Sequence, residues 1–549
     1  MSGAEVRPES VAAAALAVIG VAAGVLAVER QARRAEYRFR QVRKLANTVL
    51  FDLNREIESL AGSTRAQELL VKTSLEYLDS LAAEVDEDPT LQLEVAAAYE
   101  KVGDVGNPRF ANLGRPRDSL ASYGKALAIA RRLGSSRPAL ELLVRSYCRI
   151  GSIYERALGV QAEARENFRL GTRIADSITE KTGQPAYRLR AEAYGFLGDM
   201  DTFRDPATAA GPFRRSLEIA LEWAGAEPST ESKYFLSLAM ARMGTVFWQS
   251  GDLSQALEQF LGALRIAEEL LKEQPENAVW RREVTVHWER VGGVSGHPQH
   301  PNLGDRKSAA GWFEKMAADM EQMLAADPSN LRARFDLSEA TAELAAALRE
   351  SDPARAERFY VRSLALSGSF FNSNPRDREV GYWQAFNRVG FAWVLRRLGK
   401  RSQALAELHK AEERLEELAN GDPADTRFRE YLGVALHTRA AHWLEIGSAA
   451  EAERDLQRSL GLLEPLHQAN SRKLTLLRDV ADCYQGFGDL SASRSNWKQA
   501  QVWYQKSLEL WERWKQVGAS SVYDRQRRDL AARLAAHAAR NSSRNPSSR

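Results

Sequence analysis

Cysteine is nearly absent from this chain, which has two such residues, Cys148 and Cys483, among 549. Each lies in an amphipathic stretch, SYCRIGSIY or VADCYQGFG, where cysteine commonly serves as a small buried hydrophobe. Because the two would lie far apart in a stack of repeats, we expect both to be structural. Their scarcity leaves the redox compartment open, since a protein without disulfides fits either side of a membrane.

An excess of charge of one sign is also absent. Lysine and arginine number 76 against 73 acidic residues, a net charge of +3. Nucleic-acid binders need a basic footprint that this balance does not supply, so DNA or RNA is not an expected partner. With 44% hydrophobic and 27% charged residues, the chain has enough apolar material for a continuous core and too much for a disordered protein.

Motifs for catalysis and metal binding are missing as well. None of the eight histidines forms an HExxH or a zinc-finger spacing with another ligand type, and no GxSxG, Walker A or Cys/His arrangement occurs. The carboxylates are dispersed along helix surfaces, where charge runs are usually solvated. We therefore expect no catalytic residue, no cofactor and no metal, and predict that the chain is not an enzyme.

The most apolar segment present is VAAAALAVIGVAAGVLAV, residues 11–28. Eighteen uncharged residues in a helix span about 27 Å, just enough to cross a bilayer core. The sequence predicts a short tail at 1–10 and a transmembrane helix at 11–29. The alternative is a cleaved signal peptide, but only Arg7 precedes the run and no A-x-A site follows it. Gly20 and Gly24 form a GxxxG that would allow a homodimer.

The flanks of this segment bear on its orientation, because cytoplasmic juxtamembrane segments retain lysine and arginine. The C-terminal flank carries seven basic residues, namely Arg30, Arg33, Arg34, Arg38, Arg40, Arg43 and Lys44, against Arg7 alone on the other side. This asymmetry favours repeats that face the cytoplasm from a single-pass protein of the bacterial cytoplasmic (inner) membrane. The same arginines could also be the solvated face of a continuing helix.

Beyond residue 65 apolar residues recur at three- and four-residue spacing, interrupted by Gly, Asp-Pro and similar signals, and no strand-type alternation is sustained. Breaks at Pro275, Pro328, Pro375 and Pro423 are 53, 47 and 48 residues apart, the length of one helical hairpin with its connection. We predict juxtamembrane helices at 30–89, about nine hairpins at 90–518, a C-terminal helix at 519–540 and a disordered tail at 541–549.

A finer spacing appears in MGTVFWQSGDLSQALEQFLGA, residues 243–263. Six positions follow one pattern, namely Gly244, Phe247, Gly251, Ala256, Phe260 and Ala263. The pattern resembles the consensus of the tetratricopeptide repeat (TPR), in which a small residue lets two helices approach and aromatic residues fill the space between neighbouring hairpins. Related sets recur around Gly399 and Gly447, and other units, such as the one at Gly488, fit with lengthened turns. The predicted fold class is an all-α, TPR-like solenoid behind an N-terminal transmembrane helix.

A longer-range repeat is also present. YEKVGDVGNPRFANLG, residues 99–114, returns as WERVGGVSGHPQHPNLG, residues 288–304, at a spacing of 189 to 190 residues. Each copy would replace a tight turn by a Gly/Pro/Asn loop that ends in Asn-Leu-Gly, with Asn112 in the first loop and Asn302 in the second. A structural loop would bury these asparagines on main-chain groups, whereas a binding loop would expose them. We expect burial.

The segment from residue 38, RFRQVRKLANTVLFDLNREIESLAG, together with the first paired loop, is similar to the TPR region that follows the transmembrane helix in some bacterial serine/threonine protein kinases. The likeness covers residues 30–133, and the rest of the chain is similar to TPRs in general. A kinase Gly-rich loop, HRD-type loop and DFG are all missing, so kinase activity is not implied. In those kinases the repeats lie across the membrane from the catalytic domain, which argues against the orientation that the arginines favour.

Two functions follow from these features. The first is a membrane-anchored scaffold for protein–protein interaction, which accepts a protein or peptide in the concave groove of the solenoid. The TPR register places six residues in this groove, namely Trp248, Gln249, Glu289, Arg290, Arg396 and Arg397. The alternative is the sensory or regulatory half of a split bacterial kinase signalling system.

Overall fold

A computed structural model of the chain describes most of residues 88–544, together with Thr48, Thr73, Glu76 and Asp79. The residues between 88 and 544 that are not described are 107–115, 159, 203–204, 276, 327, 329–330, 374–377, 424, 472 and 518–521.

The described chain is helical throughout and contains no strand. It divides into two compact units, Met1–Ile129 and Ala130–Arg549. The first unit contains α4 (Pro89–Gly106) and most of α5 (Pro116–Arg132). The helices of the second unit are α6 (Arg137–Ile153), α7 (Gln161–Thr182), α8 (Tyr187–Asp199), α9 (Pro206–Ala226), α10 (Thr230–Ser250), α11 (Leu253–Glu273), α12 (Ala278–Gly296), α13 (Arg306–Ala326), α14 (Leu331–Leu348), α15 (Pro353–Ser373), α16 (Arg378–Arg397), α17 (Arg401–Gly421), α18 (Thr426–Glu445), α19 (Ala449–Ala469), α20 (Leu474–Ser493), α21 (Trp497–Val517) and α22 (Val522–Arg544). A π-helical turn, Tyr154–Leu158, follows α6.

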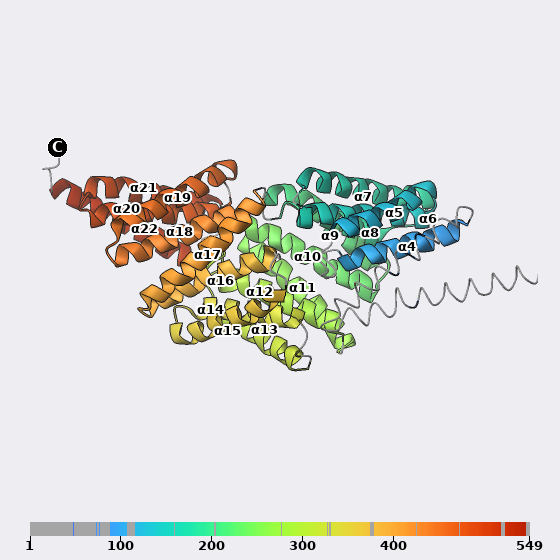
Figure 1. The fold of residues 1–549 in the computed structure, drawn as a ribbon, viewed down its shortest axis with the longest axis horizontal. Coiled ribbons are helices and arrows are strands. Elements are labelled where there is room, and N and C mark those ends of the chain that lie inside the picture. Colours follow the sequence, from blue (N-terminus) through green and yellow to red (C-terminus); the bar gives the residue numbers. More distant parts are fainter. Residues whose placement is uncertain are drawn as a thin grey trace, which may run out of the picture. The chain divides into compact units, whose positions relative to one another are not determined.

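Within the second unit, consecutive helices pair as antiparallel hairpins from α6/α7 to α20/α21, and each hairpin contacts the next (Figure 1). The first helices of neighbouring hairpins also touch, for example α8 with α10 and α18 with α20. The prediction of an all-helical, TPR-like solenoid is thereby confirmed for the described chain.

The α10/α11 hairpin shows how local sequence ends one helix and begins the next. Gly251 ends α10 in the left-handed conformation, with φ of 85°, which a residue without a Cβ adopts at little cost. Asp252 then caps α11, because its side chain accepts a hydrogen bond from the amide of Gln255. Two residues therefore close this hairpin, and the chain reverses without a longer loop.

The two helices of a hairpin approach closely where a glycine faces an aromatic ring. A Cβ added at Gly244 would lie 2.6 Å from the ring of Phe260, while Ala256 is fully buried beside it. The same pairing of small residue and ring recurs in five other hairpins, at Gly103/Tyr123, Gly151/Phe168, Gly198/Phe213, Gly292/Phe313 and Gly488/Tyr504. The predicted register is therefore right at Gly244, and it extends to the α6/α7 hairpin, whose sequence pattern is degenerate.

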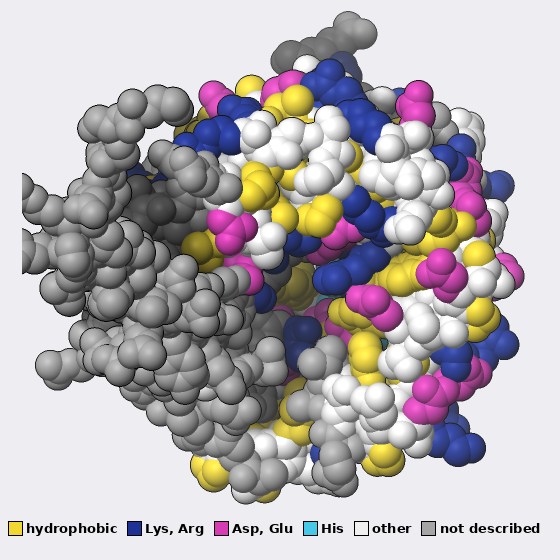
Figure 2. All heavy atoms as spheres, turned by 90° about the vertical axis from the view of Figure 1, so that its right-hand side faces the viewer, with side chains coloured by type: hydrophobic (Ala, Val, Ile, Leu, Met, Phe, Trp, Pro, Cys, Tyr) yellow, Lys and Arg dark blue, Asp and Glu magenta, His cyan; other side chains and the backbone are white. Residues whose placement is uncertain are grey.

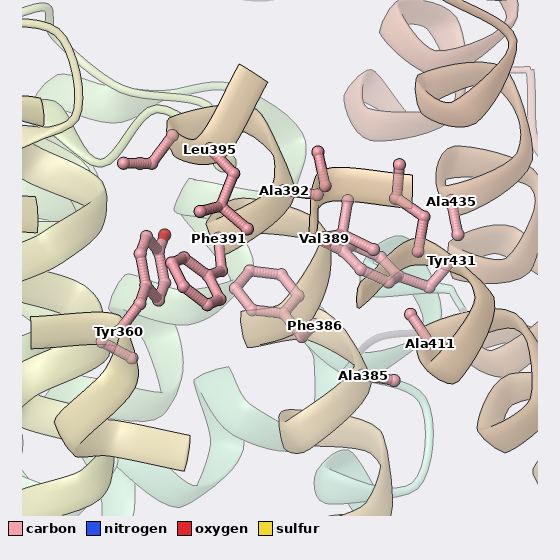
Figure 3. Packing of buried hydrophobic residues seen from close by; sticks show 14 of the residues in the cluster. Tyr360, Ala385, Phe386, Val389, Phe391, Ala392, Leu395, Ala411, Tyr431 and Ala435 are labelled. Atoms are coloured by element: carbon pink, nitrogen blue, oxygen red, sulfur yellow. The ribbon is translucent and has the colours of Figure 1, made fainter. Parts of the chain in front are cut away.

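The largest buried cluster described lies where α14 to α18 meet. Figure 3 shows the rings of Tyr360, Phe391 and Phe386 in a row beside Val389 and Tyr431. Tyr360 and Phe391 have ring centroids 5.7 Å apart, and Phe386 stacks on Tyr431 at 4.7 Å. These aromatic contacts connect three consecutive hairpins, and they leave the far side of Phe386 available to other groups.

Several expectations can be compared with these bounds. Both cysteines are free and buried, in agreement with a structural role. The last helix continues to Arg544, beyond the predicted end at residue 540. The predicted transmembrane segment at 11–29, with Gly20 and Gly24, lies outside the described residues. Among the helices that are described, none combines the length and the apolar character needed to cross a membrane.

Candidate partner-binding surface

The second of the paired loops contacts the first helices of several hairpins. We call residues 297–304, HPQHPNLG, the His-Pro loop; it connects α12 to α13. Its base is closed by main-chain hydrogen bonds from the Leu303 amide to the Val294 carbonyl, at 2.9 Å, and from the Asp305 amide to the Ser295 carbonyl, at 2.8 Å. A Cβ at Gly296 would lie 2.5 Å from the backbone of Asp305, so only glycine fits there.

The side chain of Asn302 lies inside the His-Pro loop and bonds to the main chain of the loop. It is 3% exposed, and its amide nitrogen donates to the carbonyls of His297 and His300, both at 3.0 Å. Its side-chain oxygen accepts from the amide of Gly304 at 2.8 Å. This is the arrangement that a structural role for Asn302 requires. The equivalent Asn112 lies outside the described residues.

The outer part of the His-Pro loop is held by side chains that are distant in sequence. The indole of Trp248 donates to the carbonyl of Pro301 at 2.6 Å, and the guanidinium of Arg478 donates to the carbonyl of Gln299 at 2.7 Å. The side-chain amide of Gln299 donates to the hydroxyl of Tyr431 at 2.5 Å. Three first helices, α10, α18 and α20, therefore meet at one loop.

The two loop histidines fill the space between these helices. His300 stacks on Phe386 with centroids 5.7 Å apart and meets Trp248 edge to face at 5.3 Å. Nδ1 of His297 accepts from the amide of Gln299, which places the proton of the neutral ring on Nε2, 3.2 Å from a carboxylate oxygen of Glu343. We call Trp248, Glu343, Phe386, Tyr431 and Arg478 the loop seat.

Burial sets the ionisation of these groups. It lowers the pKa of His300 to about 3 and that of His297 well below its ordinary value, with Arg478 adding repulsion in both cases. It raises the pKa of Glu343 well above the usual range, and the nearby carboxylate of Glu289 acts in the same direction. The site thus favours neutral histidines. No group of three or more metal-ligating side chains suited to a metal ion occurs in the described part of the chain.

The predicted groove residues have different surroundings. Trp248 belongs to the loop seat, and Gln249 beside it is half-buried. Arg396 is engaged by Glu445 of the next first helix, with Nε at 2.8 Å from the carboxylate, whereas Arg397 is exposed. The six residues therefore do not form one patch.

Glu289 and Arg290 belong to a charged cluster on α8, α10 and α12. Arg242 donates from Nε and Nη2 to the carboxylate of Asp199, at 3.1 and 2.9 Å. Burial lowers the pKa of Arg290, against the attraction of Glu283 and Glu289, and Nη1 of Arg290 has no hydrogen-bond partner among the described residues. Figure 2 shows one face of the molecule, on which described Lys and Arg side chains lie among Asp, Glu and hydrophobic ones.

One pair resembles catalytic machinery, since Oγ of Ser237 lies 2.9 Å from Nε2 of His287. Both residues are buried, at 2% and 0% exposure, and within the described structure Nδ1 of His287 has no partner that could orient the ring. The hydroxyl also donates to the carbonyl of Ala263 at 3.1 Å. The pair links α10, α11 and α12 and is not open to a substrate.

The sequence did not indicate four of the functional candidates, namely Phe386, Tyr431, Arg478 and Glu343. Their contacts with the loop join residues up to 179 positions apart, and no spacing rule of one hairpin reaches that far. The paired-loop repeat was the available signal, because it marked residues 288–304 as a segment with its own constraints.

Comparison with known protein families indicates which type of helical repeat part of the chain resembles. The SHNi-TPR family matches residues 481–517, which make up most of the α20/α21 hairpin. The described chain is a TPR-type helical repeat structure. No curated protein sequence matches the chain significantly.

Solved structures with a similar course of the chain share little sequence with it. Human IFIT1, solved as a dimer with m7Gppp-AAAA, has 13% identity and a TM-score of 0.43 over 83% of this chain and 87% of its own. A Rap protein complexed with competence and sporulation factor has 15% identity and a TM-score of 0.43, covering 77% and 99%. Yeast Tom70 has 14% identity and a TM-score of 0.34, covering 92% and 97%.

Proposed function

We propose that this chain is a membrane-anchored scaffold that binds a peptide segment of a partner protein along the first helices of its hairpins. One observation supports the proposal above all. In the loop seat, Trp248 and Arg478 donate to main-chain carbonyls of a loop segment, at 2.6 and 2.7 Å, although those donors belong to other hairpins. A surface that binds main-chain carbonyls in this way is suited to a peptide.

The charged cluster on α8 to α12 extends this surface. Nη1 of Arg290 has no hydrogen-bond partner in the described part of the chain, and a buried guanidinium gains most from a carboxylate or carbonyl that completes its donors. A partner's acidic side chain or main-chain carbonyl that enters between α8, α10 and α12 would complete the donors of Arg290. Gln249 lies on the same first helix as Trp248 and completes the contact surface.

Membrane anchoring by residues 11–29 is part of the proposal, with the repeats on the cytoplasmic side of the bacterial cytoplasmic membrane. The apolar run and the seven basic residues that follow it support this placement. Gly20 and Gly24 would allow two such helices to associate as a homodimer. A second candidate, the sensory half of a split kinase system, is supported by the likeness of residues 30–133 to the TPR region of membrane kinases.

The test is affinity capture from membranes with the full chain. We expect Gln249→Arg combined with Arg397→Glu to reduce recovery of the partner about tenfold or more, because the first change places a larger, charged side chain in the contact surface and the second removes a charge-assisted contact. Arg358→Glu is the matched control, because Arg358 is exposed on α15, the second helix of its hairpin. Equal recovery with both variants would refute the proposal, and protease accessibility in sealed vesicles reports the side of the membrane.

A further inference from the structure

The length of the His-Pro loop has no explanation in hairpin closure. The α10/α11 hairpin turns with two residues, Gly251 and Asp252, whereas nine residues, 297–305, separate α12 from α13. The hydrogen bonds of Leu303 and Asp305 to Val294 and Ser295 already close the base of the turn. The outer residues, 297–301, are therefore not needed to close the hairpin, and their contacts include side chains of other hairpins.

Those outer residues are bound as a peptide would be bound. The carbonyls of Pro301 and Gln299 accept from donors 53 and 179 residues away, and each of these two donors is a side chain from another hairpin. The ring of His300 enters a slot between Phe386 and Trp248, and the amide of Gln299 reaches the hydroxyl of Tyr431. Backbone acceptors give affinity, and side-chain slots give specificity, in the recognition of peptide segments.

We infer that the His-Pro loop is an internal ligand that occupies the loop seat, and that a His- and Pro-containing segment of a partner that adopts the same turn binds there by displacing it. This inference rests on the proposed function and adds the chemistry of the partner. Proline restricts the backbone before binding, which reduces the entropy lost on docking. An aromatic or imidazole ring followed by proline would place the ring on Phe386 and the proline carbonyl at the indole of Trp248.

The side chains of the loop seat stay in place when the His-Pro loop is displaced. Arg478 remains fixed because its Nε donates to Asp479 at 2.7 Å, and Tyr431 remains stacked on Phe386 at 4.7 Å. The displaced loop also keeps its folded conformation, because Asn302 bonds to the carbonyls of His297 and His300 and to the amide of Gly304. Displacement therefore exchanges one set of seat contacts for another without dismantling either part.

The experiment uses the full chain in detergent and a labelled synthetic peptide with the sequence of residues 295–304, SGHPQHPNLG. In one variant, residues 297–303 are replaced by a Gly-Ser linker of equal length, which vacates the seat. We expect the peptide to bind this variant at least about tenfold more tightly than the wild-type chain, measured by fluorescence anisotropy. Arg478→Ala in the linker variant should remove that gain, and a peptide of scrambled sequence should not bind.

Hydrogen exchange on the wild-type chain tests the same idea without a replaced loop. The amides of Gln299 and His300 should exchange through a local opening, faster than those in the middle of α16 or α18, and excess peptide should accelerate them. A folded linker variant that does not bind the peptide, a linker variant that does not fold, or loop amides that exchange only on global unfolding would overturn the inference.

These outcomes are separable from the proposed function. If partner capture depends on Gln249 and Arg397 while the peptide does not bind the linker variant, the scaffold stands and the internal-ligand inference falls. If the peptide binds the vacated seat but capture is unchanged in the Gln249→Arg/Arg397→Glu double variant, the proposed partner surface falls instead.

Discussion

Asn302 satisfies three main-chain groups of the His-Pro loop with one side chain. We expect Asn302→Ala to lower the free energy of unfolding by roughly 1–3 kcal/mol, because buried carbonyls and an amide would lose their partner. Urea denaturation of the chain measures the change. Asn420→Ala is the control, since Asn420 is exposed near the end of α17, and equal stability of the two variants would mean that Asn302 has no structural role.

His287 makes stability depend on pH. The Ser237 hydroxyl donates to the Ala263 carbonyl and so accepts from Nε2 of His287, which leaves Nδ1 without a proton. Burial first, and then the charge of Arg290, lowers the pKa of His287 from 6.5 to about 3. Below pH 6.5 His287 binds a proton in the unfolded chain but not in the folded chain. The stability that this difference contributes is therefore present above pH 6.5 and is lost as the pH falls.

The size of this effect can be measured with His287→Gln, which keeps a donor for Ser237 but cannot titrate. At pH 5.5 a buried histidine with a pKa lowered in this way reduces the free energy of unfolding by about 1 kcal/mol relative to neutral pH. We expect the loss of unfolding free energy between pH 7.5 and pH 5.5 to be smaller in the variant by about that amount. Parallel pH dependences of wild type and variant would show that His287 titrates normally in the folded chain.

At the scale of the element, each hairpin depends on a small residue beneath a large ring. Gly244→Trp should destabilise the chain by about 1–3 kcal/mol, because even a Cβ at this position would lie 2.6 Å from the ring of Phe260. Gly461→Trp is the matched control, since Gly461 lies exposed within α19 with nothing near its would-be Cβ.

Thermal unfolding distinguishes the two glycine variants. A lower midpoint for Gly244→Trp alone supports the register of the α10/α11 hairpin. Equal midpoints would mean that Gly244 does not lie at the contact of the two helices. Ala256→Arg extends the test, because it would place an unpaired charge at a fully buried position.

At the scale of the whole molecule, residues 31–549 should be soluble and almost entirely helical once the apolar run is removed, because no other segment of the sequence is apolar enough to cross a bilayer. Circular dichroism measures the helix content, and substantial β-structure would contradict the solenoid. The full chain should sediment with membranes, and its release by carbonate would argue against a transmembrane helix.

The sequence by itself determined the helical repeats, because hairpin geometry depends on short spacings. Gly244 and Phe260 are 16 positions apart, and the turn signal at Gly251 and Asp252 lies between them, so local propensity and packing indicate the same structure. The degenerate α6/α7 hairpin was harder to place, because its connection is lengthened by a π-helical turn.

Only the tertiary structure decided where the His-Pro loop lies and what Trp248, Arg396 and Arg478 contact. Stacking successive hairpins brings Gln299 to Tyr431 and Arg478, 132 and 179 residues away. Such contacts depend on the accumulated rotation between hairpins, to which every inter-hairpin interface contributes a small angle. Sequence spacing fixes each hairpin, but the sum of those angles is a property of the folded stack, and so are the contacts that it creates.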